Sequence, residues 1–254
     1  MKQLSTLAGV VASVFAFTSL STTAVVAQEA QTASAVVSPA KKTLADVEYR
    51  LPSTIAPTFQ HIHLNIDPDN PTYSGKTNID ITVKTPTKKV GFYQQDLTVT
   101  SARLVSGSSS FPLNVTIGEY DINWGESQDE IAPGKYTLEI TFEGKVNTSS
   151  DGMYLSRFEE TNYIFTQFED MHARKAFPSF DEPNFKIPYQ MTISSPEHQE
   201  IVGNTPVEKV TVENGIKTVV FEKTKPMPTY LIAYTVGPFD SAEISGLSVP
   251  GKIY

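Results

Sequence analysis

The sequence contains no cysteine and only four histidines among its 254 residues. Without cysteine, neither a disulfide bond nor a thiolate metal site is available, so stability must come from packing. Lys and Arg together number 20 against 28 Asp and Glu, which gives a formal net charge of -8. Because no cluster of basic side chains offsets this charge locally, the composition argues against nucleic acid and against an anionic membrane surface as partners.

A helical zinc-binding motif is also absent from the sequence. Such a motif needs two histidines at positions i and i+4 on one helix face, with a glutamate beside them as a base. No two of the four histidines have that spacing; they are His61, His63, His172 and His198. His61 and His63 would share one face of a strand, but no third ligand is evident. We therefore interpret them as part of a solvated strand face, with a metal pair as the alternative.

The N-terminal residues have the layout of a secretory signal peptide. Met1-Lys2 precede an apolar run from Leu7 to Phe17, and small residues follow up to Ala27, which predicts cleavage after residue 27. The apolar run is short for a hydrocarbon layer of about 30 Å, so a retained membrane anchor is the weaker alternative. We expect a periplasmic or secreted protein, followed from 28 to 46 by a flexible linker rich in Ala, Ser, Thr and Gln.

Residues 47–245 alternate between β-rich segments and turn residues, and we expect them to form one domain. Hydrophobic residues make up 39% of the chain and charged residues 19%, which is enough apolar side chain for a packed core. Alternating polarity and β-branched residues predict strands at 61–66, 77–83, 89–93, 98–105, 113–117, 135–142, 163–169, 189–193, 207–212, 217–222 and 230–238.

The predicted fold class is therefore all-β: an antiparallel β-sandwich or a saddle-like twisted sheet with little helix. The first two strands are expected to form a hairpin, and Asn214-Gly215 predicts a tight turn between two later ones. Only residues 170–176 have a helical pattern, with Asp170 as a possible cap. Residues 246–254 are expected to begin a following segment.

The most informative segment is Thr166–Pro183, with the sequence T-Q-F-E-D-M-H-A-R-K-A-F-P-S-F-D-E-P. It resembles a signature of zinc aminopeptidases of the aminopeptidase N type, the family that includes leukotriene hydrolase. Further blocks resemble that family in the same order, at 73–75, 133–154, 202–207 and 226–239, so that the resemblance covers about residues 49–240. Two departures are mild: Ser179 stands where many members carry Cys, and Met171-His172 replace a more usual Thr-Asp.

The resemblance implies a β-rich N-terminal domain that packs against a thermolysin-like catalytic domain. That catalytic part carries G-x-M-E-N and H-E-x-x-H, and neither motif occurs here. The implied function is that of the substrate-cleft domain of an exported zinc aminopeptidase, which releases N-terminal amino acids from peptides. Zinc would belong to the catalytic domain, and this chain alone would be inactive. The alternatives are a stand-alone β-sandwich module that binds peptides without catalysis, and a truncated product with no independent role.

Two residues are the candidate substrate-binding site, Gln167 and Glu169. Strict alternation in the segment 164–169 puts Phe165, Gln167 and Glu169 on one strand face. A carboxylate beside an amide is suited to holding an ammonium group through charge-assisted hydrogen bonds. In the resembling family, the matching residues bind the N-terminal amine of the peptide; an ordinary polar strand face is the alternative.

The neighbouring charged residues are interpreted as structural. Arg174 cannot act as a base, so we expect it to form an ion pair with Asp181 and Glu182 that holds the loop. Phe177, Phe180 and Phe185 are expected to be core anchors. Asn114-Val-Thr116 and Asn147-Thr-Ser149 have the form of glycosylation acceptors, which matters only in a eukaryotic secretory route.

Overall fold

A computed structural model describes residues 49–249 and 251–254 of the chain. The predicted signal peptide, 1–27, and the predicted linker, 28–46, lie outside the described residues. Within those that are described, the helical segments are two single 3-10 turns, η2 (Ala173–Lys175) and η3 (Thr229–Leu231), and the regular structure is otherwise strand. The all-β class predicted from the sequence is confirmed.

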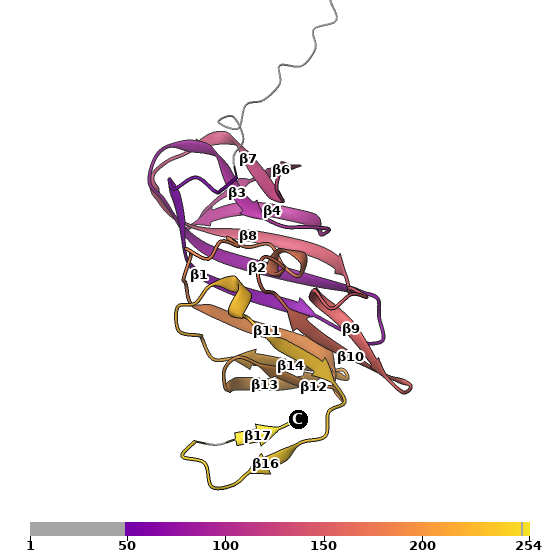
Figure 1. The fold of residues 1–254 in the computed structure, drawn as a ribbon. Coiled ribbons are helices and arrows are strands. Elements are labelled where there is room, and N and C mark those ends of the chain that lie inside the picture. Colours follow the sequence, from indigo (N-terminus) through magenta and orange to yellow (C-terminus); the bar gives the residue numbers. More distant parts are fainter. Residues whose placement is uncertain (1–48, 250) are drawn as a thin grey trace, which may run out of the picture. The chain divides into compact units, whose positions relative to one another are not determined.

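The strands form one large sheet and three smaller ones (Figure 1). The large sheet has the order β13-β14-β11-β1-β2-β8-β4-β5. Its strands are β1 (Ile55–Asn65), β2 (Thr72–Val83), β4 (Thr98–Ser106), β5 (Ser109–Pro112), β8 (Gly134–Lys145), β11 (Tyr189–Pro196), β13 (Val207–Glu213) and β14 (Ile216–Phe221). The four-stranded sheet, in the order β12-β15-β10-β9, consists of β12 (Glu200–Gly203), β15 (Tyr234–Gly237), β10 (Thr161–Gln167) and β9 (Gly152–Phe158).

The remaining strands form a three-stranded sheet and a hairpin. The three-stranded sheet, in the order β3-β7-β6, consists of β3 (Thr87–Tyr93), β7 (Ile122–Ile131) and β6 (Asn114–Ile117). The hairpin joins β16 (Ala242–Ile244) and β17 (Gly251–Ile253). Strand pairing is antiparallel as predicted, with one exception: β1 and β11 run parallel at the middle of the large sheet.

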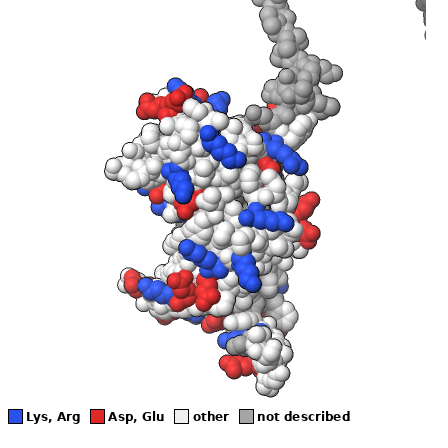
Figure 2. Space-filling model, turned by 90° about the vertical axis from the view of Figure 1, so that its left-hand side faces the viewer, with Lys and Arg blue, Asp and Glu red and all other residues white. Residues whose placement is uncertain are grey.

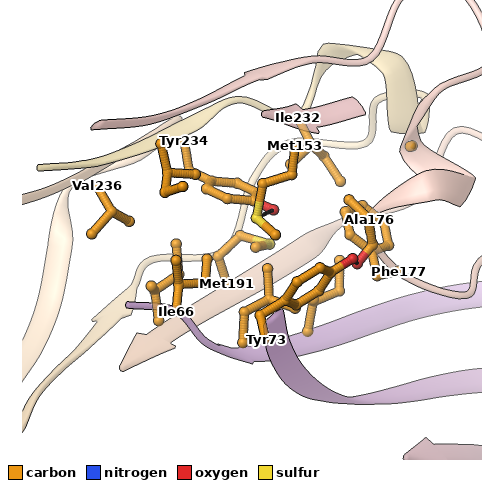
Figure 3. Packing of buried hydrophobic residues seen from close by; sticks show 14 of the residues in the cluster. Ile66, Tyr73, Met153, Ala176, Phe177, Met191, Ile232, Tyr234 and Val236 are labelled. Carbon is orange, nitrogen blue, oxygen red and sulfur yellow. Dashed lines mark hydrogen bonds between the residues drawn. The ribbon is translucent and has the colours of Figure 1, made fainter. Parts of the chain in front are cut away.

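One face of the large sheet is apolar because alternate residues of each strand point to it. The four-stranded sheet covers one part of this face, and 14 residues of the cluster between them are drawn in Figure 3. There Tyr73 from β2 and Met191 from β11 lie opposite Met153, Tyr234 and Val236 from the smaller sheet. The three-stranded sheet covers another part of the large sheet through a second cluster that includes Ile79, Leu104 and Leu138.

The opposite face of the large sheet is polar, as the alternation in β1 and β2 predicts. His61 Nε2 lies 2.9 Å from Thr192 Oγ1, and His63 Nε2 lies 2.9 Å from Ser194 Oγ. Glu139 of β8 bridges two cations on neighbouring strands, with Arg103 Nη2 at 2.7 Å and Lys76 Nζ at 3.5 Å. These pairs are partly exposed, so they add little to stability.

Several predicted elements differ from the structure. The hairpin of β1 and β2 is confirmed, and Asn214-Gly215 does form the tight turn between β13 and β14. The strands β5, β7, β9, β12 and β16 were not predicted. The segment predicted as a strand from 230 begins instead with η3, and β15 is only four residues long. Asp170 does not cap a helix: the residue before η2 is His172, whose side chain makes no capping bond.

Charge is dispersed over one face of the molecule. On the face shown in Figure 2, lysine and arginine side chains are separated by uncharged atoms, and acidic groups lie among them. Among the described residues, no helix is both long and apolar enough to cross a membrane.

Candidate functional site

The β9–β10 hairpin positions Gln167. β10 pairs with β9 in the four-stranded sheet, and Gln167 is its last residue, opposite Gly152. Burial along the segment follows the predicted alternation: Ile164 and Phe168 are buried against the large sheet, whereas Gln167 is exposed. Gly152 has φ of 67°, and a Cβ there would lie 3.1 Å from Lys175 Cβ, so the chain beside Gln167 has little room for a side chain.

Glu169 lies close to Gln167 but not on the strand. β10 ends at Gln167, so the prediction that Glu169 belongs to the same strand is wrong; Glu169 sits in the turn that follows. The turn is fixed by the Glu169 N–H, which donates to Gln167 Oε1 at 3.1 Å. The peptide bond between Glu169 and Asp170 is cis. Both predicted residues are exposed, and the hydrogen bond between them brings them together at the end of β10.

The carboxylate of Glu169 is available to a ligand. Within residues 49–249 and 251–254, no ion pair involves Glu169 or its neighbour Asp170. The nearby Asp151 is by contrast neutralised by Lys175 of η2. A hydrogen bond from the Lys175 ammonium, reinforced by one from Ser149, lowers the pKa of Asp151 below its usual value. An exposed carboxylate with an adjacent amide and no cation of its own is chemically suited to accept an ammonium group.

An aromatic surface continues from Gln167 along the same face of the hairpin, and the sequence alone does not reveal it as a unit. Phe165 stacks with Tyr154 across the strands, at 6.2 Å between ring centroids, and with Tyr163 at 6.5 Å. Phe239, after β15, contacts both Tyr163 and Phe165. All four rings are half-buried. Alternation within β10 could have indicated Tyr163 and Phe165, but Tyr154 and Phe239 come from other segments and only pairing brings them there.

The predicted structural ion pair is present for Asp181. Arg174 of η2 is buried, and its Nε donates to Asp181 Oδ2 at 2.8 Å while its Nη2 donates to the Asp181 carbonyl oxygen at 2.9 Å. The guanidinium also lies over the Tyr93 ring, 4.1 Å from its centroid. The other carboxylate oxygen of Asp181 accepts a hydrogen bond from the Thr229 hydroxyl.

Glu182 does not join this ion pair. Its Oε1 accepts hydrogen bonds from the Tyr93 hydroxyl at 3.0 Å and from the Leu51 N–H at 2.8 Å. Burial, together with the charge of Glu182, raises the pKa of Tyr93 well above its ordinary value, so the hydroxyl stays a donor. The charged loop therefore joins η2 to strand β3 and to the start of the domain, and its role is structural.

The three phenylalanines of this segment pack as predicted. Phe177 and Phe180 are buried, and Phe185 is half-buried and meets Phe180 edge to face at 5.6 Å between centroids. They are core anchors and not a ligand box. Of the two acceptor asparagines, Asn114 is exposed on β6, whereas the Asn147 amide donates to the Asp151 carbonyl oxygen and carboxylate.

The described residues offer no group of three or more His, Asp and Glu side chains that could hold a metal ion. His61 and His63 lie on the polar face of the large sheet, each with Nε2 engaged by a hydroxyl. Burial lowers the pKa of both imidazoles, and for His61 the neighbouring His63, Lys76 and Lys223 add to the effect. Lys76 and Lys223 make the surroundings of His61 unfavourable to a metal cation, and no third ligand joins the two histidines among the described residues, so they do not fit a zinc centre.

A cavity of about 610 Å³ lies at a different place, near the ends of β1, β2, β8 and β11. Its carboxylates come from Asp67, Asp96 and Glu143, beside Lys145, and neither Gln167 nor Glu169 lines it. Gln167 and Glu169 are both exposed, so the candidate site lies at the surface of the described residues.

Comparisons with known proteins agree on one family. Residues 56–231 match the peptidase M1 N-terminal domain. The sequence is 32% identical to a glutamyl aminopeptidase of Bitis rhinoceros over 219 residues, which is 81% of the chain. It is 31% identical to an aminopeptidase N of Acetobacter pasteurianus over 214 residues. A human glutamyl aminopeptidase is 31% identical over 222 residues. The chain spans 23% of the length of the Bitis and human proteins and 59% of the Acetobacter protein.

Proposed function

Because the chain belongs to the peptidase M1 family through its N-terminal domain, we propose that it provides the part of an aminopeptidase that binds the amino terminus of the peptide substrate. Glu169 accepts the substrate ammonium group, and Gln167 accepts a further hydrogen bond from it. The first partner of the chain is thus the amino terminus of the peptide, and the second is the rest of the aminopeptidase, including its catalytic domain.

The observation that carries this proposal is the pairing of Gln167 and Glu169 at the end of β10. The hydrogen bond from the Glu169 N–H to Gln167 Oε1 holds the Gln167 side chain beside the backbone of Glu169. A carbonyl oxygen has two lone pairs, so Gln167 Oε1 retains capacity for one more donor. A carboxylate without a cationic partner gains a charge-assisted hydrogen bond when an ammonium arrives, and such bonds are about twice as strong as neutral ones.

The aromatic surface beside Gln167 supports the same assignment. An ammonium held at Glu169 belongs to the first residue of a peptide, whose side chain has to lie close by. Phe165 and Tyr154 offer apolar ring faces within the same hairpin, and burying apolar area there contributes about 25 cal/mol per Å². The hydrogen bonds would fix the amine, and the rings would contact the side chain.

We place the zinc ion outside the described residues, because those residues offer no group of three or more side chains that could hold a metal ion. When bound in an M1 catalytic domain, zinc supplies an activated water for peptide hydrolysis. The residues of this chain bind and orient the substrate, and no catalytic step is assigned to them. Export through the predicted signal peptide, 1–27, is part of the proposal and rests on the sequence alone.

The test is kinetic and uses the whole aminopeptidase of which we propose this chain forms part. Glu169→Gln keeps the shape of the side chain but removes the charge, so KM for dipeptide-like substrates should rise by about tenfold to a hundredfold, since a hydrogen bond to a charged group contributes about 1.5–3 kcal/mol. Glu197→Gln, an exposed carboxylate distant in sequence, is the matched control. Equal kinetics for wild type and Glu169→Gln would refute the assignment.

A further inference from the structure

Strand β13 forms one end of the large sheet and has a free edge. β14 pairs with one side of it, and no strand among the described residues pairs with the other. Three of its valines are unusually exposed, with 48% of Val207, 51% of Val210 and 51% of Val212 accessible. An unpaired edge with exposed apolar side chains is a template for a further strand.

The turn after β13 determines which backbone groups are free. Asn214 and Gly215 have φ of 54° and 77°, which is the pattern of a type I′ hairpin. In such a hairpin the flanking residues, Glu213 and Ile216, exchange both hydrogen bonds. Because bonding alternates along an antiparallel ladder, Thr211 also bonds to β14, and the N–H and C=O groups of Val210 and Val212 point away from it.

We propose that β13 pairs antiparallel with β13 of a second copy of this chain, with Thr211 on the twofold axis. Thr211 then faces Thr211 of the second copy, and each Val210 faces Val212 of the other chain. The outward backbone groups of these valines bond to each other, which joins two large sheets into one. This inference does not depend on the proposed peptide-binding function.

Charge selects this register. Lys209 and Glu213 are both exposed, and neither takes part in an ion pair among the residues the structure describes. With Thr211 at the centre, Lys209 of each chain faces Glu213 of the other, and opposite charges across a strand pair are favourable. Centring the pairing on Val210 instead would place Lys209 opposite Thr211 and leave Glu213 unmatched.

The absence of cysteine from the sequence allows a direct geometric test. Opposed residues of a non-hydrogen-bonded pair have Cα atoms about 4.5 Å apart, within the roughly 4.4–6.8 Å span of a disulfide. Thr211→Cys in the full chain should therefore give a disulfide-linked dimer under mild oxidation. Thr116→Cys on β6, an edge strand of the three-stranded sheet, is the matched control and should give no disulfide-linked dimer. Equal crosslinking of the two variants would overturn the proposal.

A charge exchange tests the register without oxidation. In sedimentation velocity over a concentration series, Lys209→Glu and Glu213→Lys should each raise the dimer dissociation constant by about tenfold, equivalent to about 1.4 kcal/mol, because each creates two like-charge pairs. The double variant should regain wild-type dimerisation. Lys135→Glu, an exposed lysine on β8, should have no effect. A wild-type chain that stays at 27.9 kDa at every concentration, or a dimer insensitive to both single changes, would overturn the proposal.

Discussion

Replacing Arg174 by Ala should destabilise the domain far more than its place in a surface-like charged segment suggests. The side chain is only 7% exposed, and that of Asp181 is 2% exposed. Removal of the guanidinium leaves the Asp181 carboxylate buried without its cation. Breaking one member of a buried ion pair typically costs about 3–5 kcal/mol, because the remaining charge is uncompensated.

Other contacts of Arg174 are lost in the same substitution. The guanidinium donates to the Asp181 carbonyl oxygen and covers the Tyr93 ring, and a cation–π contact contributes about 0.5–2 kcal/mol depending on burial. These contacts share one side chain, so their energies are not additive. We expect a total loss of about 3–5 kcal/mol.

A matched control exists in the same chain. Arg157 pairs with Glu160 at 2.6 Å, a shorter distance than the Arg174–Asp181 pair, but the two side chains are 58% and 94% exposed. Exposed pairs contribute about 0–1 kcal/mol, so Arg157→Ala should be nearly neutral. Comparable losses of unfolding free energy for Arg174→Ala and Arg157→Ala would refute the argument that burial, and not distance, determines how much an ion pair contributes to stability.

The assay is equilibrium unfolding in urea. The sequence has a single tryptophan, Trp124 on β7, whose fluorescence reports on the three-stranded sheet. Circular dichroism follows the strands of the whole domain. Coincident transitions from the two probes would justify a two-state free energy, and the difference in that free energy between variant and wild type is compared with the expected value.

Two further outcomes are expected. Gly144→Ala on β8 places a Cβ against the buried ring of Tyr73, so it should lower the free energy of unfolding by about 1–3 kcal/mol in the same urea assay. Gly134→Ala is the control: its Cβ meets nothing closer than 3.4 Å, so it should cost far less. Equal losses for the two variants would contradict the steric argument. Burial lowers the pKa of His61 and His63 from 6.5, so the unfolded state takes up protons first and stability falls as the pH drops below 6.5. Exchanging both for Gln should reduce the loss of stability measured between about pH 7.5 and about pH 5.5, and an unchanged pH profile would contradict this.

Local patterns in the sequence predicted the faces of the strands well. Polarity alternates along β1 and β10, and the structure buries Ile62 and Ile164 while exposing Gln167. The Asn214-Gly215 turn also follows from local chemistry, since both residues tolerate positive φ. These features depend on neighbours in sequence, which is why they could be predicted.

Features set by distant residues could not be predicted in the same way. β7 runs from Ile122 to Ile131 with many polar residues, and only its pairing between β3 and β6 makes it a strand. The alternation of apolar and polar residues continues past the end of β10 to Phe168, which is buried, and this pattern predicted that Glu169 belongs to the strand. The bond between Tyr93 and Glu182 joins residues 89 positions apart, and no local signal announces it.

The parallel pair at the middle of the large sheet has a consequence for the order of events during biosynthesis. All three strands of the antiparallel ladder β1, β2 and β8 have been synthesised once the chain reaches residue 145, so each has a pairing partner from that point on. The junction of β1 with β11 joins positions such as His61 and Thr192, 131 residues apart. Until translation passes Pro196, one edge of β1 remains without its native partner, and a nascent chain is exposed to mispairing there for the whole of that interval.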